Sequence, residues 1–283
     1  MEPLENWRVL TLAINIPGPV AAARLTELGA SVLKVEPPSG DPLALASPSW
    51  YAALHESVVV ERVNLKETVG QERLAQWLAE TDLLLTASRP ASLERLGLAW
   101  SHLGRRYPRL CQVAIVGYPP PEADKPGHDL TYQAALGLTQ PPELPRTVLA
   151  DLAGAAQAVS AALAMLLLRE RSGSAALPAE QRYTQVALAA AAADFAAPLQ
   201  HGLTGPDGLL GGLLPGYNFY EASDGWIAVA ALERHFHQRL AEALALTAVT
   251  EENLAALFRQ RRATEWARWA AERDLPLVAV ADA

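Results

Sequence analysis

The chain has little cysteine and a shortage of positive charge. Its single cysteine, Cys111, cannot form a disulfide within the chain. Lys and Arg total 23 against 31 Asp and Glu, which gives a formal net charge of -8. A protein that binds nucleic acid regardless of sequence needs a clustered excess of Lys and Arg to neutralise phosphates. We therefore expect no nucleic-acid partner, and any anionic ligand would have to meet a local basic group.

From the distribution of charged and apolar residues we also expect no targeting segment and no membrane span. The acidic start, Met1 to Glu5, lacks the basic and then apolar order of a signal peptide. The most apolar run, residues 158–168, is too short to cross a bilayer, so we interpret it as part of a buried core helix and expect no membrane partner. With one cysteine, these features suit a reducing, cytoplasmic location.

Hydrophobic residues, at 51% of the 283 positions, are numerous enough to bury a large core. In the first half, patterns typical of strands and of helices alternate. The expected strands are 8–12, 30–35, 82–85 and 109–116, and Cys111 is a small core residue in the last. The expected helices are 21–29, 70–79, 92–98 and 101–106. This alternation predicts an α/β fold with a mostly parallel sheet covered by helices.

The second half of the chain shows a different pattern of expected helices and strands. A long apolar helix is expected over 152–171, a strand over 181–185, an Ala-rich helix over 186–199 and a flexible loop over 205–216. Residues 217–222 and 226–230, joined by Ser223-Asp224-Gly225, predict a β-hairpin. Helices over 234–246 and 263–271 and a strand over 276–280 follow. We expect a large domain, residues 1–175, and a smaller α+β domain, residues 176–283.

A dinucleotide site is the first function that an N-terminal βαβ unit suggests. Glu36 ends the second predicted strand, where an acid that binds ribose would lie. Only Gly18 falls in the turn after the first strand, so the glycine spacing that brings backbone close to a pyrophosphate is absent. The sequence therefore argues against an NAD enzyme.

Two adjacent ionisable residues, His128 and Asp129, stand before a short helical run that Gly137 can end. Proton transfer or acyl transfer could use this imidazole and carboxylate. The alternative is structural, with Asp129 as the N-cap of the helix and His128 as a turn residue. Asp151 has the same structural alternative, as the N-cap of its helix. The structural alternative for Glu233 is a solvated carboxylate at the start of a helix.

Several short motifs in this chain have a familiar order. They occupy residues 8–10, 18–19, 28–38, 89–90, 94–98, 108–110, 127–130, 150–154, 220–225 and 264–266. Together they resemble the family III CoA-transferases (CaiB/BaiF), which include the α-methylacyl-CoA racemases. The resemblance implies a Rossmann-like large domain, a smaller second domain and an interlocked homodimer. It also implies an acyl-CoA substrate, with coenzyme A as part of the substrate and no bound prosthetic group.

Two chemistries compete within this resemblance. A racemase would use His128 and Asp151 on opposite faces of the α-carbon of a 2-methyl-branched acyl-CoA, with Glu233 fixing the His tautomer. A transferase would attack the thioester through Asp129 and form an acyl anhydride. His128 and Glu233 match the racemase pattern, so we expect a racemase or epimerase first, CoA transfer second, and a non-catalytic relative third.

The resemblance also suggests contacts to CoA, through Arg89, Lys34 and Lys125 and the backbone of Ile16. The basic segment that relatives use for CoA phosphates reads His55-Glu56-Ser57-Val58-Val59 here, and a proline-rich loop precedes His128. The chain stops near Val280, earlier than most relatives, so the C-terminal return segment is expected to be shortened. His235 and His237 lie two positions apart on a helix and point to different faces, so we expect no metal site.

Overall fold

The computed structural model describes residues 2–173 and 177–281. The chain forms two compact units, one up to Ala196 and one from Ala197 onward. The sequence predicts the division at 175/176, about one strand and one helix earlier. The difference arises because the strand after the long helix returns to the first sheet, so its residues belong to the first unit.

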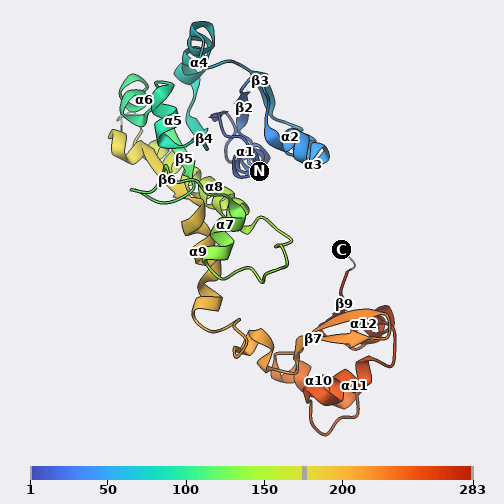
Figure 1. The fold of residues 1–283 in the computed structure, drawn as a ribbon. Helices are drawn as coiled ribbons and strands as arrows, with labels where there is room; N and C mark the ends of the chain where they lie inside the picture. The colour runs from blue at the N-terminus through green and yellow to red at the C-terminus, as the bar shows by residue number, and fades with distance from the viewer. Residues whose placement is uncertain (1, 174–176, 282–283) are drawn as a thin grey trace. The chain divides into compact units, whose positions relative to one another are not determined.

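The first unit is built on a parallel sheet (Figure 1). In its described residues the sheet has six strands in the order β3-β2-β1-β4-β5-β6. Their bounds are β1 Arg8–Thr11, β2 Ser31–Glu36, β3 Val59–Arg62, β4 Leu83–Thr86, β5 Cys111–Val116 and β6 Tyr183–Ala187. The central strands β4 and β5 are buried at every position, as expected for apolar runs covered on both faces of a parallel sheet.

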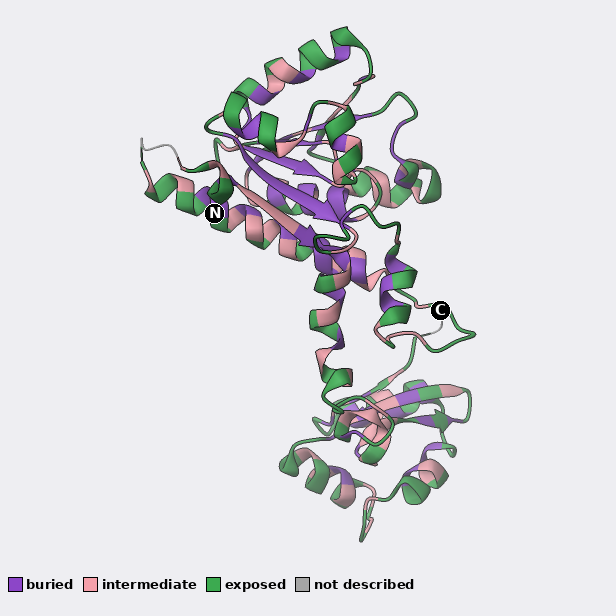
Figure 2. Ribbon diagram, turned by 60° about the vertical axis from the view of Figure 1, so that its left-hand side comes forward, coloured by how far each residue is buried: buried purple, intermediate pink, exposed green. Residues whose placement is uncertain are grey.

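Helices cover both faces of this sheet, which Figure 2 shows as a buried layer between exposed helices. Helices α1 (Pro17–Glu27) and α8 (Leu149–Arg171) pack against each other and share a core with β1, β4 and β5. A second core holds α4 (Thr68–Glu80), α5 (Pro90–Arg95) and α6 (Trp100–Arg106) against the other face. The shorter helices are α2 (Pro42–Ala46), α3 (Pro48–Leu54) and α7 (Asp129–Ala135). This arrangement is the predicted α/β class.

Helix α8 is longer than the apolar run within it. At 23 residues it is long and apolar enough to cross a membrane by length and composition, which corrects the expectation from residues 158–168 alone. Its buried side is a row of small residues, including Ala150, Ala155, Ala158 and Ala162, that lies against α1, β5 and β6. These contacts make α8 a core helix of the first unit.

The strand order reverses beside β1, because β2 and β3 lie on one side of it and β4 to β6 on the other. At such a point the loops after neighbouring strands diverge and leave a crevice at the carboxyl ends of the strands. Residues after β1, β4 and β5 therefore meet at one edge of the sheet. Gly18 lets the first turn of α1 approach the loop after β1, since a Cβ there would lie 2.2 Å from the Cβ of Ala13.

The second unit has a three-stranded antiparallel sheet, β7-β8-β9, in its described residues. The predicted hairpin forms β7 (Tyr217–Ala222) and β8 (Gly225–Ala230), and β9 (Leu277–Ala279) pairs with β8. Helices α10 (Arg234–Ala243), α11 (Glu251–Phe258) and α12 (Ala263–Ala271) enclose a core around Phe258 and Trp266. Helix α9 (Leu188–Gln200) crosses the boundary between the two units, and η2 (Leu209–Leu213) lies in the predicted loop.

Some elements have no counterpart in the sequence prediction, namely β3, α2, α3, η1 (Ala179–Arg182) and α11. Strand β3 is an edge strand with only four partly exposed residues, so it shows no apolar pattern. Helices α2 and α3 have five and seven residues, too few for helical periodicity to appear. Both begin at a proline, and tertiary contacts with α1 and β2 decide their conformation.

Candidate active site

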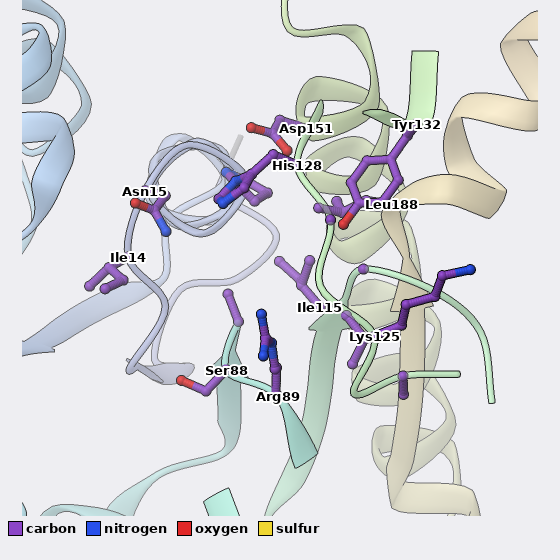
Figure 3. Close-up of a pocket in the computed structure, with 16 residues that line it drawn as sticks. Ile14, Asn15, Ser88, Arg89, Ile115, Lys125, His128, Tyr132, Asp151 and Leu188 are labelled. Carbon is purple, nitrogen blue, oxygen red and sulfur yellow. The ribbon is translucent and has the colours of Figure 1, made fainter. Parts of the chain in front are cut away.

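A cavity of about 180 Å³ opens at the crevice of the first unit (Figure 3). The loop after β1 contributes Ile14 and Asn15, and the loop after β4 contributes Ser88 and Arg89. The end of β5, the proline-rich loop, α7, α8 and the start of α9 complete the wall. They contribute Ile115, Val116, Gly117, Ala123, Lys125, Gly127, His128, Tyr132, Asp151 and Leu188. The fold thus brings His128 and Asp151, two of the predicted catalytic residues, into one cavity.

His128 is the residue before the first turn of α7. Its backbone N–H donates to the Thr131 hydroxyl at 3.1 Å, and that hydroxyl donates to the His128 carbonyl at 2.7 Å. The imidazole is exposed on the cavity side. Asp129 is the first residue of α7 and not its N-cap, so the N-cap alternative for Asp129 does not apply to this helix.

Asp129 instead binds the start of α8. One of its oxygens accepts the backbone N–H of Asp151 at 3.1 Å, and the other accepts the Gln133 amide at 2.6 Å. Gln133 also donates to the carbonyl of Thr147, just before α8, at 3.0 Å. Asp129 is 8% exposed and does not line the cavity. Its carboxylate is therefore fully occupied in fixing α7 to the first turn of α8.

Asp151 has a different environment. It lies in the first turn of α8 with its side chain at the cavity. Burial and, after it, the nearby negative charge of Asp129 together raise the pKa of Asp151 to about 7. At neutral pH this group is therefore divided between carboxylic acid and carboxylate, which suits a group that exchanges protons, and its carboxylate form can act as a nucleophile.

Tyr132 closes the floor between α7 and the proline-rich loop. Its ring packs edge-on against Tyr118, with centroids 5.2 Å apart, and burial raises the pKa of its hydroxyl to about 12. Gly127 lies so close to this ring that a Cβ would come within 2.6 Å of it. The glycine before His128 is thus required by the packing of Tyr132.

Two of the predicted CoA contacts line the cavity. Arg89 precedes α5 and its guanidinium points toward the interior in Figure 3. Lys125 lies in the proline-rich loop, with its ammonium 4.7 Å from the Tyr118 ring centre and 3.6 Å from Glu122, and Figure 3 shows it pointing away from Arg89. Asp124 of the same loop accepts the Ala91 N–H at 3.0 Å, which ties the loop to α5.

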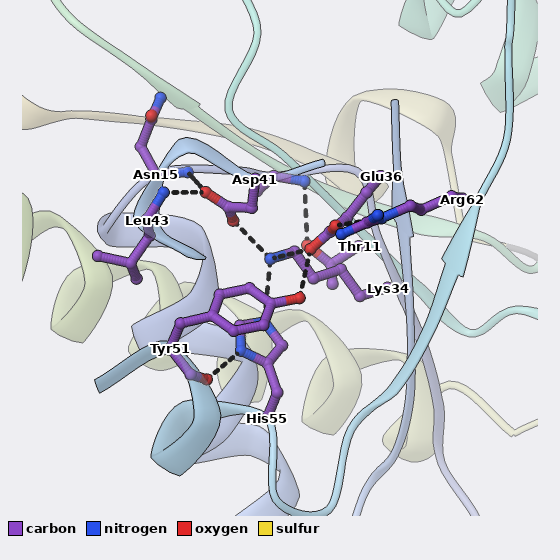
Figure 4. Close-up of polar contacts among 10 residues, drawn as sticks. Thr11, Asn15, Lys34, Glu36, Asp41, Leu43, Tyr51, His55 and Arg62 are labelled. Carbon is purple, nitrogen blue, oxygen red and sulfur yellow. Dashed lines mark hydrogen bonds and ion pairs between the residues drawn. The ribbon is translucent and has the colours of Figure 1, made fainter. Parts of the chain in front are cut away.

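Lys34 has a structural environment instead (Figure 4). Its ammonium is 0% exposed and lies 2.5 Å from Asp41 and 3.0 Å from Glu36. His55 is its third neighbour, at 2.9 Å from the Nε2 atom. A side chain with no exposed surface cannot reach a CoA phosphate, so the prediction that Lys34 binds CoA is wrong. Alternating residues of a buried strand point to opposite faces, and Lys34 points under α3 instead of into the crevice.

His55 occupies the position where relatives have a basic segment. Its Nδ1 lies 2.6 Å from the Tyr51 carbonyl, and its Nε2 faces the Lys34 ammonium, which can only donate. The network therefore assigns a neutral imidazole with its proton on Nδ1. Burial lowers the pKa of His55, as expected for a histidine beside a lysine. This segment of the chain thus joins a buried ion cluster and lies away from the cavity.

The predicted roles of Ile16 and Glu233 stay predictions. Ile16 precedes α1 and is partly buried between two lining residues, Asn15 and Pro17, but is not itself a lining residue. Glu233 precedes α10 in the second unit and is exposed there, so its pairing with His128 is untested. The interlocked homodimer is likewise a prediction. Among the described residues, no group of three His, Cys, Asp or Glu side chains could hold a metal ion.

The sequence prediction missed Asn15, Tyr132 and the role of Gln133. Asn15 stands directly before the Pro17-Gly18-Pro19 turn that begins α1, which is a position at the carboxyl edge of a parallel sheet. Tyr132 and Gln133 follow His128 by four and five residues, so their proximity was visible in the sequence. Their contacts with Tyr118 and with the Thr147 carbonyl were not visible, because these groups lie outside α7.

An α/β fold with a topological switch point and a cavity that holds an acidic residue of raised pKa defines an enzyme-like protein. The family model of CoA-transferase family III matches residues 4–283. The chain therefore belongs to CoA-transferase family III, as the motifs predict.

Named relatives agree with this family. A probable fatty acyl-CoA transferase of Mycobacterium tuberculosis is 31% identical over 196 residues, which are 62% of this chain and 49% of that protein. A succinyl-CoA:D-citramalate CoA-transferase of Chloroflexus aurantiacus is 30% identical over 264 residues, 86% of this chain and 65% of that protein. The chain thus spans less than two thirds of each of these relatives.

Solved structures share the fold. A crystal structure of a Mycobacterium tuberculosis protein matches 99% of this chain and 86% of its own with a TM-score of 0.82, at 24% identity. A CAIB/BAIF family protein of Brucella suis matches 99% of this chain and 84% of its own with a TM-score of 0.79, at 21% identity. At these identities the likeness concerns the fold.

Proposed function

We propose that this protein transfers coenzyme A between carboxylic acids and that Asp151 is its nucleophile. The observation that carries the proposal is the contrast between the two aspartates. Asp151 lines the cavity with a pKa raised to about 7, whereas both oxygens of Asp129 are bonded to protein donors. This replaces Asp129, the transferase nucleophile that the resemblance suggests, with a group that a substrate can reach. The names of the relatives support transfer over racemisation.

The reaction follows from the chemistry of a carboxylate. Asp151 adds to the thioester carbonyl, a C–O bond forms and the C–S bond breaks, which leaves an acyl anhydride on the enzyme and a CoA thiolate. The acceptor carboxylate attacks the aspartyl carbonyl of this anhydride and displaces the donor acid. The thiolate then attacks the acceptor acyl carbon, and the product thioester leaves with Asp151 as carboxylate again. A raised pKa makes the Asp151 carboxylate a stronger base and nucleophile.

The other residues have distinct tasks in this scheme. Asp129 and Gln133 hold the first turn of α8 and thereby the position of Asp151. The charge of Asp129 contributes to the raised pKa of Asp151. Arg89 is the cation of the cavity wall that is best placed for an anionic part of the substrate, since planar guanidinium binds phosphate or carboxylate with two hydrogen bonds.

The test is to trap the acyl enzyme. The protein is incubated with acetyl-CoA, succinyl-CoA or a fatty acyl-CoA, quenched with hydroxylamine and digested, and the modified peptide is identified by mass spectrometry. We expect the hydroxamate on Asp151 and its loss in Asp151→Asn. Asp129→Asn is the matched control and should still form the adduct, at about 10- to 100-fold lower rate because Asp151 is less well held. A hydroxamate on Asp129 would contradict the assignment.

Racemisation is the second candidate, because His128 and Asp151 line the same cavity. A pair of acid and base groups is what inversion through an enolate needs. A 2-methylacyl-CoA in heavy water would then gain deuterium at its α-carbon, and His128→Ala would abolish the gain. Exchange of acids without α-deuteration in the wild type would leave transfer as the activity.

A further inference from the structure

Asn15 has a backbone conformation that most residues avoid. Its φ is +69°, in the left-handed region where asparagine is the most tolerated residue after glycine. It lies between β1 and α1, at the edge of the cavity, and its side chain is exposed there (Figure 3). Such a conformation persists only where surrounding contacts determine it, and it is often found at functional sites.

The contacts that determine it come from the buried ion cluster in Figure 4. Asp41, which is 2% exposed, accepts the Asn15 N–H with one oxygen at 2.9 Å and the Leu43 N–H with the same oxygen at 2.9 Å. Its other oxygen pairs with Lys34 at 2.5 Å. The cluster therefore fixes the backbone of Asn15 through a charged group that is itself immobile.

The carboxamide of Asn15 has no hydrogen-bond partner within residues 2–173 and 177–281. A side-chain amide with two free N–H bonds, on a backbone that Asp41 holds at the wall of a cavity that also contains Asp151, is suited to bind a substrate oxygen. We infer that Asn15 is a substrate-binding residue whose side-chain N–H donates to the carbonyl oxygen of the acyl group in this cavity. This inference rests on the proposed function.

This hydrogen bond would stabilise the charge that forms during the reaction. Negative charge develops on the thioester oxygen as Asp151 adds to the carbonyl carbon, and an N–H donor at this oxygen stabilises that charge. Free CoA has a thiol in place of the acyl carbonyl, so it cannot make this contact. The Asn15 amide should therefore distinguish acyl-CoA from CoA.

Asn15→Gly is the cleanest variant, because glycine keeps the positive φ and the N–H bond to Asp41 while the carboxamide is lost. We expect kcat/KM for acid exchange to fall about 10- to 100-fold. Asn15→Asp keeps the size and turn preference but exchanges the donor for a negative acceptor, so it should lose at least as much. Activity of Asn15→Gly equal to wild type, in an enzyme that does exchange acids, would overturn the inference and leave the proposed function intact.

If no exchange of acids is found, a binding experiment tests the role of Asn15 separately from the proposed CoA transfer. In the Asp151→Asn background, dissociation constants for free CoA and for succinyl-CoA are measured by calorimetry with and without Asn15→Gly. We expect Asn15→Gly to weaken succinyl-CoA about tenfold and to leave free CoA unchanged. Equal changes for the two ligands, or no change in either, would overturn the role of Asn15 whatever the reaction proves to be.

Discussion

The first unit contains two groups of carboxylates that have opposite surroundings. Under α3, Glu36 and Asp41 enclose the ammonium of Lys34 at 3.0 and 2.5 Å. At the cavity, Asp129 and Asp151 lie beside each other, and neither has an ion-pair partner within the described residues. The group under α3 contains its own cation, Lys34, whereas the second group borders a cavity that can hold a substrate.

This difference distinguishes carboxylates that stabilise the fold from a carboxylate that can react. A buried carboxylate that is paired and hydrogen-bonded is held in one state, since removal of its partner would leave an uncompensated charge. A partly buried carboxylate beside another carboxylate has a raised pKa and changes its charge near neutral pH, as Asp151 does. Neutralising one charge in each group should therefore change stability in opposite directions.

The largest expected effect is from Lys34→Met, which leaves Glu36 and Asp41 buried without their cation. Loss of one partner of a buried ion pair costs about 3–5 kcal/mol, so the free energy of unfolding should fall by that amount in urea titrations followed by circular dichroism. Lys66→Met is the matched control at an exposed lysine, where a change within about 0.5 kcal/mol is expected. Equal midpoints for the two variants would show that the ion cluster does not support the fold.

Asp151→Asn should act in the other direction. The pKa of Asp151 is raised from 3.8 to about 7, so its protonated form adds stability that is fully present below pH 3.8 and lost as pH rises through about 7. The variant cannot ionise. We expect it to match the wild type near pH 4 and to exceed it by up to about 4 kcal/mol at pH 8, since a pKa shift of roughly three units corresponds to about 1.4 kcal/mol for each unit.

The measurement for Asp151→Asn is the difference in unfolding free energy between variant and wild type across pH. A difference that stays constant from pH 4 to pH 8 would contradict the raised pKa. A gain of stability together with loss of the proposed activity would be a trade-off between stability and activity at this residue.

The smallest effect concerns His55. Its pKa is lowered by burial, so the neutral form adds stability that is present above the ordinary value of 6.5 and is lost as pH falls below it. Wild-type stability should therefore fall toward acid, relative to His55→Gln, by at most about 1.4 kcal/mol per pH unit. Exposed His102, changed to Gln, serves as the control, and a similar slope in both variants would argue against the neutral imidazole beside Lys34.

Local patterns foretold the sheet and most of its helices. Apolar runs predict β4 and β5, and the turn Ser223-Asp224-Gly225 between two strand-like runs predicts the hairpin of β7 and β8, because each depends on neighbours in the chain. The edge strand β3 has no such pattern and is joined to β2 by backbone pairing and by the ion pair of Arg62 with Glu36. Its place depends on a partner that lies 26 residues earlier in the chain.

The candidate site was foretold in part. His128, Asp151 and Arg89 belong to motifs, and the order of strands brings them to one edge of the sheet. Lys34 belongs to a motif too, but its side chain points to the face under α3. Residue type identified charged groups correctly, whereas the face of the strand decided which of them a ligand can reach.

The sequence by itself determined the family, the α/β class and the two adjacent groups His128 and Asp129, because these depend on motifs and local periodicity. Only the tertiary structure decided that Asp129 is occupied by the Asp151 N–H, 22 residues away, and that Asp41 holds Asn15, 26 residues away. The physical reason is that desolvation and hydrogen bonding act between groups that folding brings together. The same carboxylate is therefore an anchor at one position and a reactive group at another.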